Sequence, residues 1–346
     1  MKQDLQQLFA NWLQSEYGEE FSGVLSVYQG SELILAQAVG YRNRAERLPN
    51  LPNTAFALAS GTKLFTALAV CNLLKQGKLN LTDTLGSILP ADLGTIDPGI
   101  TIGQLLTHTS GIGDYIDEDQ DTDAQLDHLY RTYPSYLWTS MDYYLQMMTS
   151  LPPKFEKGTE VSYSNTGYIM LGLVIEAVSG TSYQQFVTKH IIKALNLTHT
   201  GFYSLDALPA NTALGYLQDD ETGAWKTNMF SVPIIGGSDG GIFSSAADLT
   251  VLWNAIVSGE LLGEAVTEQL LTPHAVAYAE YDLHYGLGVY VKQGAGKPYY
   301  YTAGYDAGVH VQSAYFPEQQ LSVCVLGNVM DFDPYALMAN VRAYLN

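Results

Sequence analysis

Ser60 and Lys63 lie three residues apart, at the start of a stretch whose composition favours a helix up to Gly77. Residues at positions i and i+3 of a helix share one face, with Cβ atoms roughly 5–6 Å apart. An amine at that distance can take the proton from a serine hydroxyl and activate the oxygen as a nucleophile. The amino end of the helix adds partial positive charge near the same oxygen. The pair therefore predicts a nucleophilic serine; a capping serine beside a surface lysine is the alternative.

A second candidate group precedes a predicted helix that starts near residue 165. Tyr163 and Asn165 form a Tyr-x-Asn pattern there, which also occurs, less suitably placed, at Tyr41–Asn43 and Tyr344–Asn346. A lysine ammonium beside a phenol lowers the pKa of the phenol, which can then pass a proton to a leaving group. An asparagine side chain offers a donor and an acceptor to a substrate amide. Both side chains are therefore candidates for the same site.

A competing serine motif, Gly-x-Ser-x-Gly, spans residues 236–240. It is typical of the nucleophile elbow of α/β-hydrolases, which joins a strand directly to a helix within alternating strands and helices. Residues 241–245 are a poor helix start, and the alternating pattern is missing elsewhere. We therefore expect a glycine-rich turn here.

Seven carboxylates between residues 114 and 127 could indicate a calcium loop. The EF-hand pattern requires glycine where Thr122 stands and glutamate where His128 stands, so we expect a solvated loop instead. The seven histidines show no metal-ligand spacing. No metal ion and no organic cofactor are expected. The carboxylates are Asp114, Asp117, Glu118, Asp119, Asp121, Asp123 and Asp127.

Composition restricts the class of protein. A chain of 346 residues with 47% hydrophobic residues can bury a large core, in one domain or two closely packed subdomains. The formal charge of −19 argues against nucleic acid and anionic membranes as partners and weakly favours a neutral or cationic ligand. Cys71 and Cys324 lie in apolar runs and are expected to be reduced core residues. The partner is therefore expected to be a small molecule or a peptide, in an oligomeric state that the sequence does not define.

The first residues predict an amphipathic helix. Its apolar residues are dispersed along a stripe rather than gathered in a block, unlike those of a secretion signal. No run approaches the 18 apolar residues of a transmembrane helix. A cytoplasmic location is expected from this sequence, and an extracytoplasmic one if an export signal has been removed. The stripe consists of Leu5, Leu8, Phe9, Trp12 and Leu13.

Predicted strands lie at both ends of the chain, around a helical middle. They suggest one antiparallel sheet built from the two termini, with the middle as a large insertion beside it. We expect a single domain, 1–346, in which 1–58 and 283–346 form an α/β subdomain and 59–282 a mainly helical one. The strands are predicted at residues 23–28, 33–39, 285–291, 299–302, 309–316 and 321–326, followed by a closing helix at 334–345.

Three motifs in order carry a resemblance to a known family: Ser60–Lys63, Leu105–Gly111 and Tyr163–Tyr168. The chain closely resembles the serine β-lactamase/penicillin-binding family, in the branch of class C β-lactamases, D-alanyl-D-alanine carboxypeptidases and related esterases. The resemblance covers about residues 20 to 345. It implies an α/β (α+β) fold: an α/β/α sandwich with an antiparallel sheet, plus an all-helical subdomain.

The resemblance also implies roles. Ser60 looks like the nucleophile that forms an acyl-enzyme, Lys63 and Tyr163 like a coupled proton-transfer pair, and Asn165 like a contact to the substrate amide. Which of Lys63 and Tyr163 takes the first proton stays open, because coupled groups titrate as a pair. His108, within the second motif, is expected to be structural.

The family's third motif, Lys/His-Thr/Gly-Gly, falls on residues 302–304 and departs from the pattern. Thr302 replaces the cation and Gly304 keeps the glycine, while Tyr305 would supply one N–H of the oxyanion hole and Ser60 the other. A neutral threonine binds a substrate carboxylate only about half as strongly as a cation, and Asp306 adds negative charge. His310 could replace the lost cation or face away from the site.

The sequence thus predicts a serine hydrolase acting on an amide or ester: a β-lactam, a D-amino-acid peptide or a small ester. Carboxypeptidase and esterase activities both fit. The changed third motif favours uncharged esters, amides or amine-bearing peptides over carboxylate-bearing β-lactams. The alternative is a catalytically silent penicillin-binding-like domain that holds a ligand or acts as a sensor.

Overall fold

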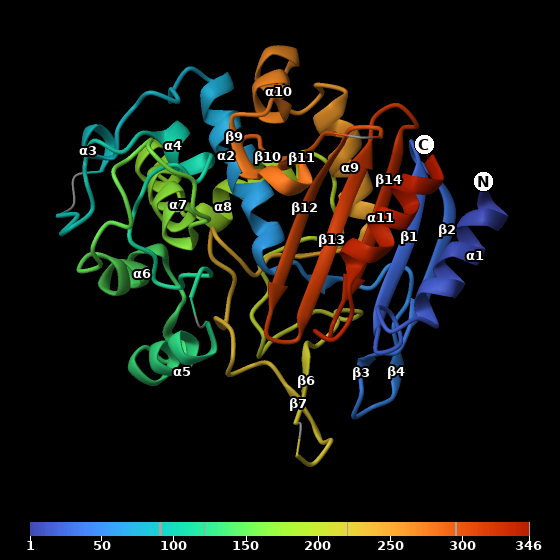
Figure 1. Ribbon diagram of the computed structural model, residues 1–346. Coiled ribbons are helices and arrows are strands. Elements are labelled where there is room, and N and C mark those ends of the chain that lie inside the picture. Colours follow the sequence, from blue (N-terminus) through green and yellow to red (C-terminus); the bar gives the residue numbers. More distant parts are fainter. Residues whose placement is uncertain (90–91, 121, 220, 295, 346) are drawn as a thin grey trace.

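The computed structural model of the protein describes residues 1–89, 92–120, 122–219, 221–294 and 296–345. Among these residues an antiparallel sheet of eight strands runs in the order β2-β1-β14-β13-β12-β11-β10-β9 (Figure 1). The two ends of the chain meet in this sheet, because β1 pairs with β14 along its whole length. The strands are β1 (Gly23–Gln29), β2 (Glu32–Val39), β9 (Ala275–Tyr278), β10 (Leu283–Tyr285), β11 (Tyr290–Lys292), β12 (Tyr299–Asp306), β13 (Val309–Phe316) and β14 (Leu321–Gly327).

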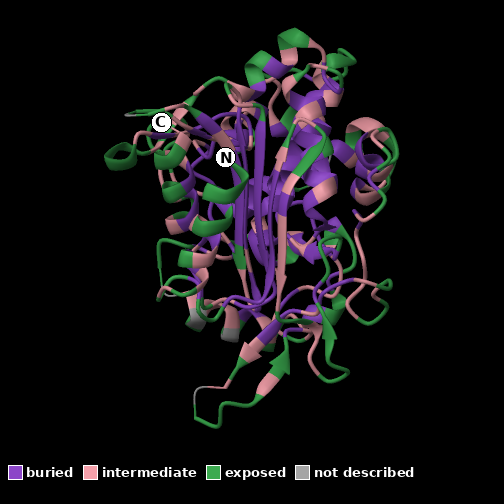
Figure 2. Ribbon diagram, turned by 90° about the vertical axis from the view of Figure 1, so that its right-hand side faces the viewer, coloured by how far each residue is buried: buried purple, intermediate pink, exposed green. Residues whose placement is uncertain are grey.

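Helices cover both faces of the sheet. The helices α1 (Lys2–Leu13) and α11 (Pro334–Leu345) pack together on one face, and α9 (Ala246–Val257) contacts the central strands from the other. The predicted apolar stripe of α1 is confirmed, since Leu5, Phe9 and Trp12 are buried. Figure 2 shows the central strands buried between these layers, with exposed residues on the outer helices and the loops. This order of layers confirms the predicted α/β/α sandwich with an antiparallel sheet.

The remaining helices form a region beside the sheet (Figure 1). Its centre is α2 (Thr62–Lys75) against α7 (Asn165–Ser179), which are both largely buried. Around them lie α3 (Leu85–Ile88), α4 (Ile102–Leu106), α5 (Thr122–Thr132), α6 (Met141–Met148), α8 (Tyr183–Val187), the π-helical turn η3 (Thr188–Ile192) and α10 (Glu264–Leu271). Within the described ranges, no helix is long and apolar enough to cross a membrane.

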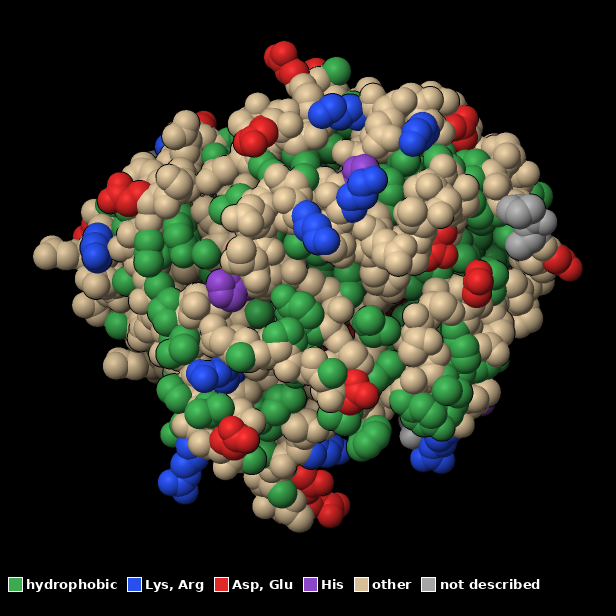
Figure 3. Space-filling view, turned by 180° about the vertical axis from the view of Figure 1, so that it is seen from behind, with side chains coloured by type: hydrophobic (Ala, Val, Ile, Leu, Met, Phe, Trp, Pro, Cys, Tyr) green, Lys and Arg blue, Asp and Glu red, His purple; other side chains and the backbone are tan. Residues whose placement is uncertain are grey.

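Short elements complete the chain. Within the described part of the chain, three two-stranded ladders pair β3 with β4, β5 with β8 and β6 with β7. On the face of the molecule in Figure 3, Lys, Arg, Asp and Glu side chains are scattered among apolar and neutral atoms rather than gathered in one patch. The short strands and 3₁₀ turns are β3 (Tyr41–Asn43), β4 (Leu48–Pro49), β5 (Phe56–Ala57), β6 (Tyr216–Gln218), β7 (Trp225–Thr227), β8 (Phe243–Ser244), η1 (Ala59–Gly61), η2 (Ser135–Leu137) and η4 (Ala279–Tyr281).

Two expectations differ from the structure. The single strand predicted at 285–291 is wrong: the segment is a hairpin of β10 and β11, which turns where Gly288 takes a φ of +68°. Glycine adopts such a φ readily, whereas the apolar pattern hid the turn. The boundary predicted at residue 283 falls inside the sheet, because β9 pairs with β10 and α9 packs against β14.

Candidate active site

Ser60 lies in the 3₁₀ turn η1, directly before α2. The preceding residue, Ala59, has a φ of +45°, a conformation that is uncommon for a residue other than glycine. The helix ends close to the predicted position, where Gly77 takes a φ of +66°. Ser60 is therefore held on a sharp turn at the amino end of a buried helix.

The amine of Lys63 has three partners within hydrogen-bonding distance. Its Nζ lies 3.1 Å from Ser60 Oγ, 2.7 Å from Asn165 Oδ1 and 2.8 Å from the backbone oxygen of Asp239. An ammonium has three protons to donate, so these contacts define its position completely. The side chain is only 4% exposed. Burial lowers the pKa of Lys63 below its ordinary value, and the Asp239 carboxylate opposes that shift.

Tyr163 lies against Lys63 and Ser60. Lys63 Nζ is 4.7 Å from the centre of its ring. Burial raises the pKa of Tyr163 well above its ordinary value, the charge of Glu118 adds to the rise, and a hydrogen bond with Ser60 opposes it. The expectation of a lowered pKa for this phenol is therefore wrong in direction, because desolvation raises the pKa more than the hydrogen bond with Ser60 lowers it. Both groups of the pair are shifted toward their neutral forms.

The ring of His108 packs against the ring of Tyr163. The two rings stack with centres 4.6 Å apart, and His108 Nδ1 accepts a hydrogen bond of 3.0 Å from the backbone N–H of Ser164. Burial holds the pKa of His108 well below its ordinary value, so the ring is neutral. These contacts are those of a structural histidine.

His108→Ala is expected to destabilise the protein by about 2–4 kcal/mol. The variant leaves the buried N–H of Ser164 without its acceptor, which costs about 1–3 kcal/mol, and it keeps alanine at a φ of +59°. Urea denaturation at pH 7 measures the change, with His128→Ala, at an exposed histidine, as the control. Equal midpoints for the two variants would contradict the structural role.

Asn165 is the first residue of α7 and is held on every side. Its Oδ1 accepts from Lys63, while its Nδ2 donates to the backbone oxygen of Ile116 at 3.2 Å and to Glu118 Oε1 at 3.1 Å. The amide is thus engaged within the protein as well as lining the site. Its predicted contact to a substrate stays a prediction.

The acidic segment before α5 was expected to be a solvated loop, but two of its carboxylates bind other parts of the protein. Asp114 accepts hydrogen bonds from the backbone N–H groups of Asn165 and Thr166, at 2.7 and 3.0 Å, and so caps α7. Asp117 is buried and pairs with Lys154 at 2.6 Å. No cluster of potential metal ligands occurs in the part of the chain that the structure describes. Asp121 lies outside the described residues, as do the side chains of Asp123 and Asp127.

The predicted third motif lies on β12, directly against the turn that carries Ser60. A Cβ atom added to Gly304 would lie 2.0 Å from the backbone oxygen of Leu58 and 2.9 Å from the nitrogen of Gly61. Only glycine permits this approach of strand and turn. Thr302 Oγ1 lies 3.5 Å from the oxygen of Gly61, and the Tyr305 side chain is exposed at the end of the strand. The structure thus brings Thr302, Gly304 and Tyr305 to Ser60.

Gly304→Ala is expected to lower kcat/KM about 100-fold, because β12 must move by more than 1 Å away from η1 and misalign the reacting groups. Ester turnover with thermal denaturation as a second readout measures this. Gly223→Ala, in the distant β6–β7 hairpin, is the control for a glycine-to-alanine change away from the site, since the nearest atom to an added Cβ there is Gln218 Nε2 at 3.8 Å. Unchanged turnover in Gly304→Ala would show that the contact between β12 and η1 does not control the geometry of the site.

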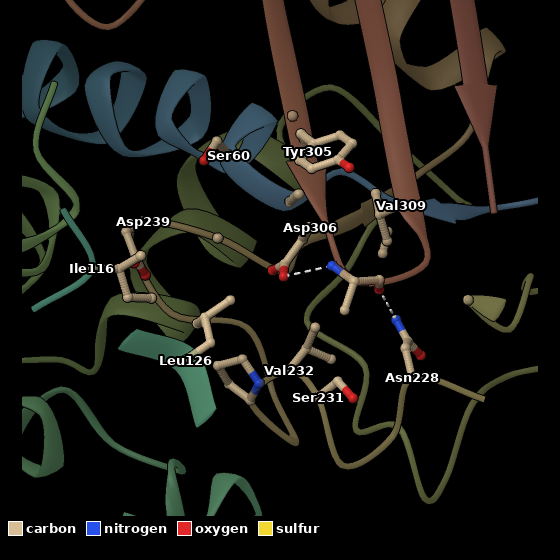
Figure 4. Close-up of a pocket in the computed structure, with 18 of the residues that line it drawn as sticks. Ser60, Ile116, Leu126, Asn228, Ser231, Val232, Asp239, Tyr305, Asp306 and Val309 are labelled. Atoms are coloured by element: carbon tan, nitrogen blue, oxygen red, sulfur yellow. Dashed lines mark hydrogen bonds between the residues drawn. The ribbon is translucent and has the colours of Figure 1, made fainter. Parts of the chain in front are cut away.

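A cavity of about 790 Å³ opens beside Ser60. Asp306, whose negative charge was expected beside the third motif, contributes a carboxylate to it. Asp239 and Glu118, which no motif assigned to the site, contribute two more. Figure 4 shows Asp306 at the end of β12, its carboxylate turned into the space below Ser60. Burial raises the pKa of Asp306 to about 7. Apolar groups form much of the rest of the wall: Ile116, Leu126, Tyr130, Trp138, Tyr203, Leu205, Leu217, Phe230, Val232 and Val309.

The Gly-x-Ser-x-Gly segment forms part of the cavity wall, and its serine is not placed to act as a nucleophile. Ser238 is fully buried, and its hydroxyl lies 3.3 Å from Met141 Sδ. The backbone oxygen of Asp239 accepts a hydrogen bond from Lys63, and its carboxylate accepts one from the hydroxyl of Tyr115. The expected glycine-rich turn is confirmed. Its glycines were the feature of the sequence that could have indicated that this backbone packs closely against the site.

His310 faces away from the site. Its ring lies 4.9 Å from that of Tyr305 and 5.0 Å from that of Phe332, and its Nδ1 is 3.3 Å from the oxygen of Met330. Phe332 belongs to the core on the side of α1 and α11. Of the two orientations left open by the sequence, His310 therefore has the one that does not replace the missing cation.

The class of protein follows from this fold and from comparisons with known proteins. The chain belongs to the beta-lactamase family, whose pattern matches residues 11–345. It is 28% identical over 332 residues, 95% of this chain and 75% of the relative, to the putative penicillin-binding protein PbpX of Bacillus subtilis (strain 168). The resemblance and the fold predicted from the motifs are thereby confirmed.

Solved structures agree with this assignment. A penicillin-binding protein from Bacillus halodurans superposes with a TM-score of 0.89 at 40% identity, covering 98% of this chain and 99% of the other. The octameric penicillin-binding protein homologue from Pyrococcus abyssi gives 0.84 at 26% identity, covering 99% and 76%. The chain is thus similar to penicillin-binding proteins over nearly its whole length.

Proposed function

We propose that the protein is a serine hydrolase that works through an acyl-enzyme on Ser60. The observation that carries the proposal is the 3.1 Å contact between Lys63 Nζ and Ser60 Oγ at the mouth of the large cavity. Membership of the beta-lactamase family supports it. Neither a metal ion nor an organic cofactor is needed for this reaction.

The pKa directions favour Lys63 as the first base. A neutral amine takes the proton from Ser60, and Oγ then attacks the carbonyl carbon of the substrate. Tyr163, whose raised pKa keeps it protonated, donates its proton to the leaving group and is reprotonated through Lys63. The backbone N–H groups of Ser60 and Tyr305 stabilise the oxyanion. This order deepens the sequence-based view, which left the first base open.

The preferred substrate is a neutral or amine-bearing ester or amide. Thr302 stands where the family pattern has a cation, and Asp306, Asp239 and Glu118 face the same cavity. A substrate carboxylate would be repelled there, whereas an ammonium group would be attracted. The apolar part of the wall suits the body of such a substrate.

Asp306→Asn is expected to lower the preference for amine-bearing esters about tenfold, since a hydrogen bond to a charged group contributes about 1.5–3 kcal/mol. The measure is the ratio of kcat/KM for the p-nitrophenyl esters of 6-aminohexanoate and heptanoate. With a pKa of about 7 for Asp306, this ratio should rise as pH increases through 7 and the carboxyl ionises. It should stay level in Asp306→Asn; Glu260→Gln, at an exposed surface residue, is the control. A ratio independent of pH in the unmodified protein would contradict this assignment.

Labelling with a fluorophosphonate tests the proposed function directly. The unmodified protein should gain one label, which Ser60→Ala should lose while retaining its fold. Hydrolysis of p-nitrophenyl esters should be faster than that of nitrocefin. Absence of both labelling and turnover would overturn the proposal and favour the silent ligand-binding or sensor domain. Efficient nitrocefin turnover well above that of esters would overturn the substrate preference alone.

A further inference from the structure

A second, much smaller cavity lies behind Ser60. It measures about 20 Å³ and shares Ser60, Tyr163, Tyr290 and Ala303 with the wall of the large cavity. A water molecule needs roughly 10–15 Å³ of such space, and the small cavity therefore fits a single water and no substrate. The rest of its wall is formed by Lys63, His108, Tyr168, Tyr285, Gly288, Val289 and Thr302.

The wall is polar enough to bind a water. An ordered water needs two to four polar partners, and four of the residues that line the cavity carry hydroxyls: Ser60, Tyr163, Thr302 and Tyr285. Ser60 and Tyr163 are at the same time the proposed reacting groups. A water in this cavity thus lies next to both.

Thr302 is the residue that leaves room for this cavity. It occupies the motif position where the family pattern has Lys or His, and a longer side chain there would fill the space. At Gly288, another residue of the cavity wall, there is no room for a side chain, since an added Cβ would lie 2.5 Å from Ala67 Cβ and 2.9 Å from the Tyr168 hydroxyl. The threonine that stands in place of the family's cation is thus also part of the cavity wall.

We propose that the small cavity holds the water that hydrolyses the acyl-enzyme, a proposal that rests on the function proposed above. The acyl carbon is bonded to Ser60 Oγ, at the boundary of the two cavities. The water oxygen attacks this carbon while its proton passes to the Lys63–Tyr163 pair. The bond between the carbon and Oγ then breaks, Oγ takes that proton back, and the carboxylic acid leaves through the large cavity.

In this arrangement Thr302 and Tyr285 are positioning residues for the water. Tyr285 lines the small cavity, and its ring packs 4.6 Å from that of His108. Changing either residue should slow deacylation and affect acylation much less, because the substrate enters on the other side of Ser60. A purely structural role would slow both steps together.

Stopped-flow measurement with p-nitrophenyl acetate separates the two steps. In Thr302→Ile, which fills the cavity, and in Tyr285→Phe, which removes one hydroxyl, we expect a burst of p-nitrophenolate approaching one equivalent. Steady-state turnover should fall about 10- to 100-fold, in the range for a misplaced reactant. Mass spectrometry should detect the acetyl-enzyme. Tyr300→Phe, on the same strand and face as Thr302, should behave like the unmodified protein.

Hydroxylamine provides a second readout, because it reaches the acyl-enzyme through the large cavity. It should restore release of the acyl group in both variants. An equal fall of burst rate and turnover, with no acetyl-enzyme, would overturn the water site while leaving the proposed function intact. No burst, turnover or labelling in the unmodified protein would instead refute the proposed function. If Thr302→Ile does not fold, Tyr285→Phe alone decides.

Discussion

Lys63→Met is expected to lower kcat/KM for p-nitrophenyl esters roughly 10⁴-fold, the scale of losing one member of a nucleophile–base unit. The variant keeps the length of the side chain but removes the amine that contacts Ser60, Asn165 and the Asp239 backbone. Lys75→Met is the matched control, since Lys75 lies on the same helix and donates to the oxygen of Leu261 instead. A loss of less than tenfold in Lys63→Met would exclude this amine as the base.

The pH profile tests the same assignment. A base must be neutral to accept a proton, so kcat/KM should rise as pH increases through the pKa of Lys63. Burial lowers that pKa below the ordinary 10.5, so the rise should be complete at a lower pH than for an exposed lysine. A profile that rises only at the ordinary value would show that the amine stays protonated in the free protein.

Thr302→Lys is expected to raise the rate of acylation by nitrocefin at least tenfold relative to that by p-nitrophenyl acetate. A cation at this position would offer a charged hydrogen bond to a substrate carboxylate, which contributes about 1.5–3 kcal/mol. Acylation and not turnover is the measure, because the longer side chain also fills the small cavity.

Thr302→Met is the matched control for that experiment. It has a similar length and no charge, so it should reproduce the effect of filling the cavity without improving nitrocefin acylation. Equal nitrocefin rates in the two variants would show that the missing cation does not control carboxylate recognition. The cause would then lie with the carboxylates of Asp306, Asp239 and Glu118.

Local sequence was sufficient for several elements. The hairpin of β1 and β2, the stripe of α1 and the helix after Ser60 were all predicted. Burial on one face leaves a regular pattern in α1, whereas α2 is buried on all sides and was predicted from its helix-favouring composition and from the glycine at its end. The tight turn between β10 and β11 was missed. The turn contains two glycines within an apolar run, and a continuous buried strand can have the same sequence pattern.

The core of the candidate site was also predicted from short motifs. Ser60 and Lys63 are three residues apart, and a single helical turn brings their side chains together whatever the rest of the protein does. Tyr163 was placed by its motif, but the direction of its pKa was not. That direction depends on how completely the folded protein removes water from the phenol, and no spacing in the chain measures this.

Other features depend on the tertiary structure alone. The backbone oxygen of Asp239 and the amide of Asn165 reach Lys63 across 176 and 102 residues of chain. Asp114 caps α7 from 51 residues away. The sequence by itself determined that Ser60 and Lys63 are neighbours, because one helical turn sets their distance. Packing of the sheet against the helical region decided which groups surround them, since contacts between distant segments depend on the whole core.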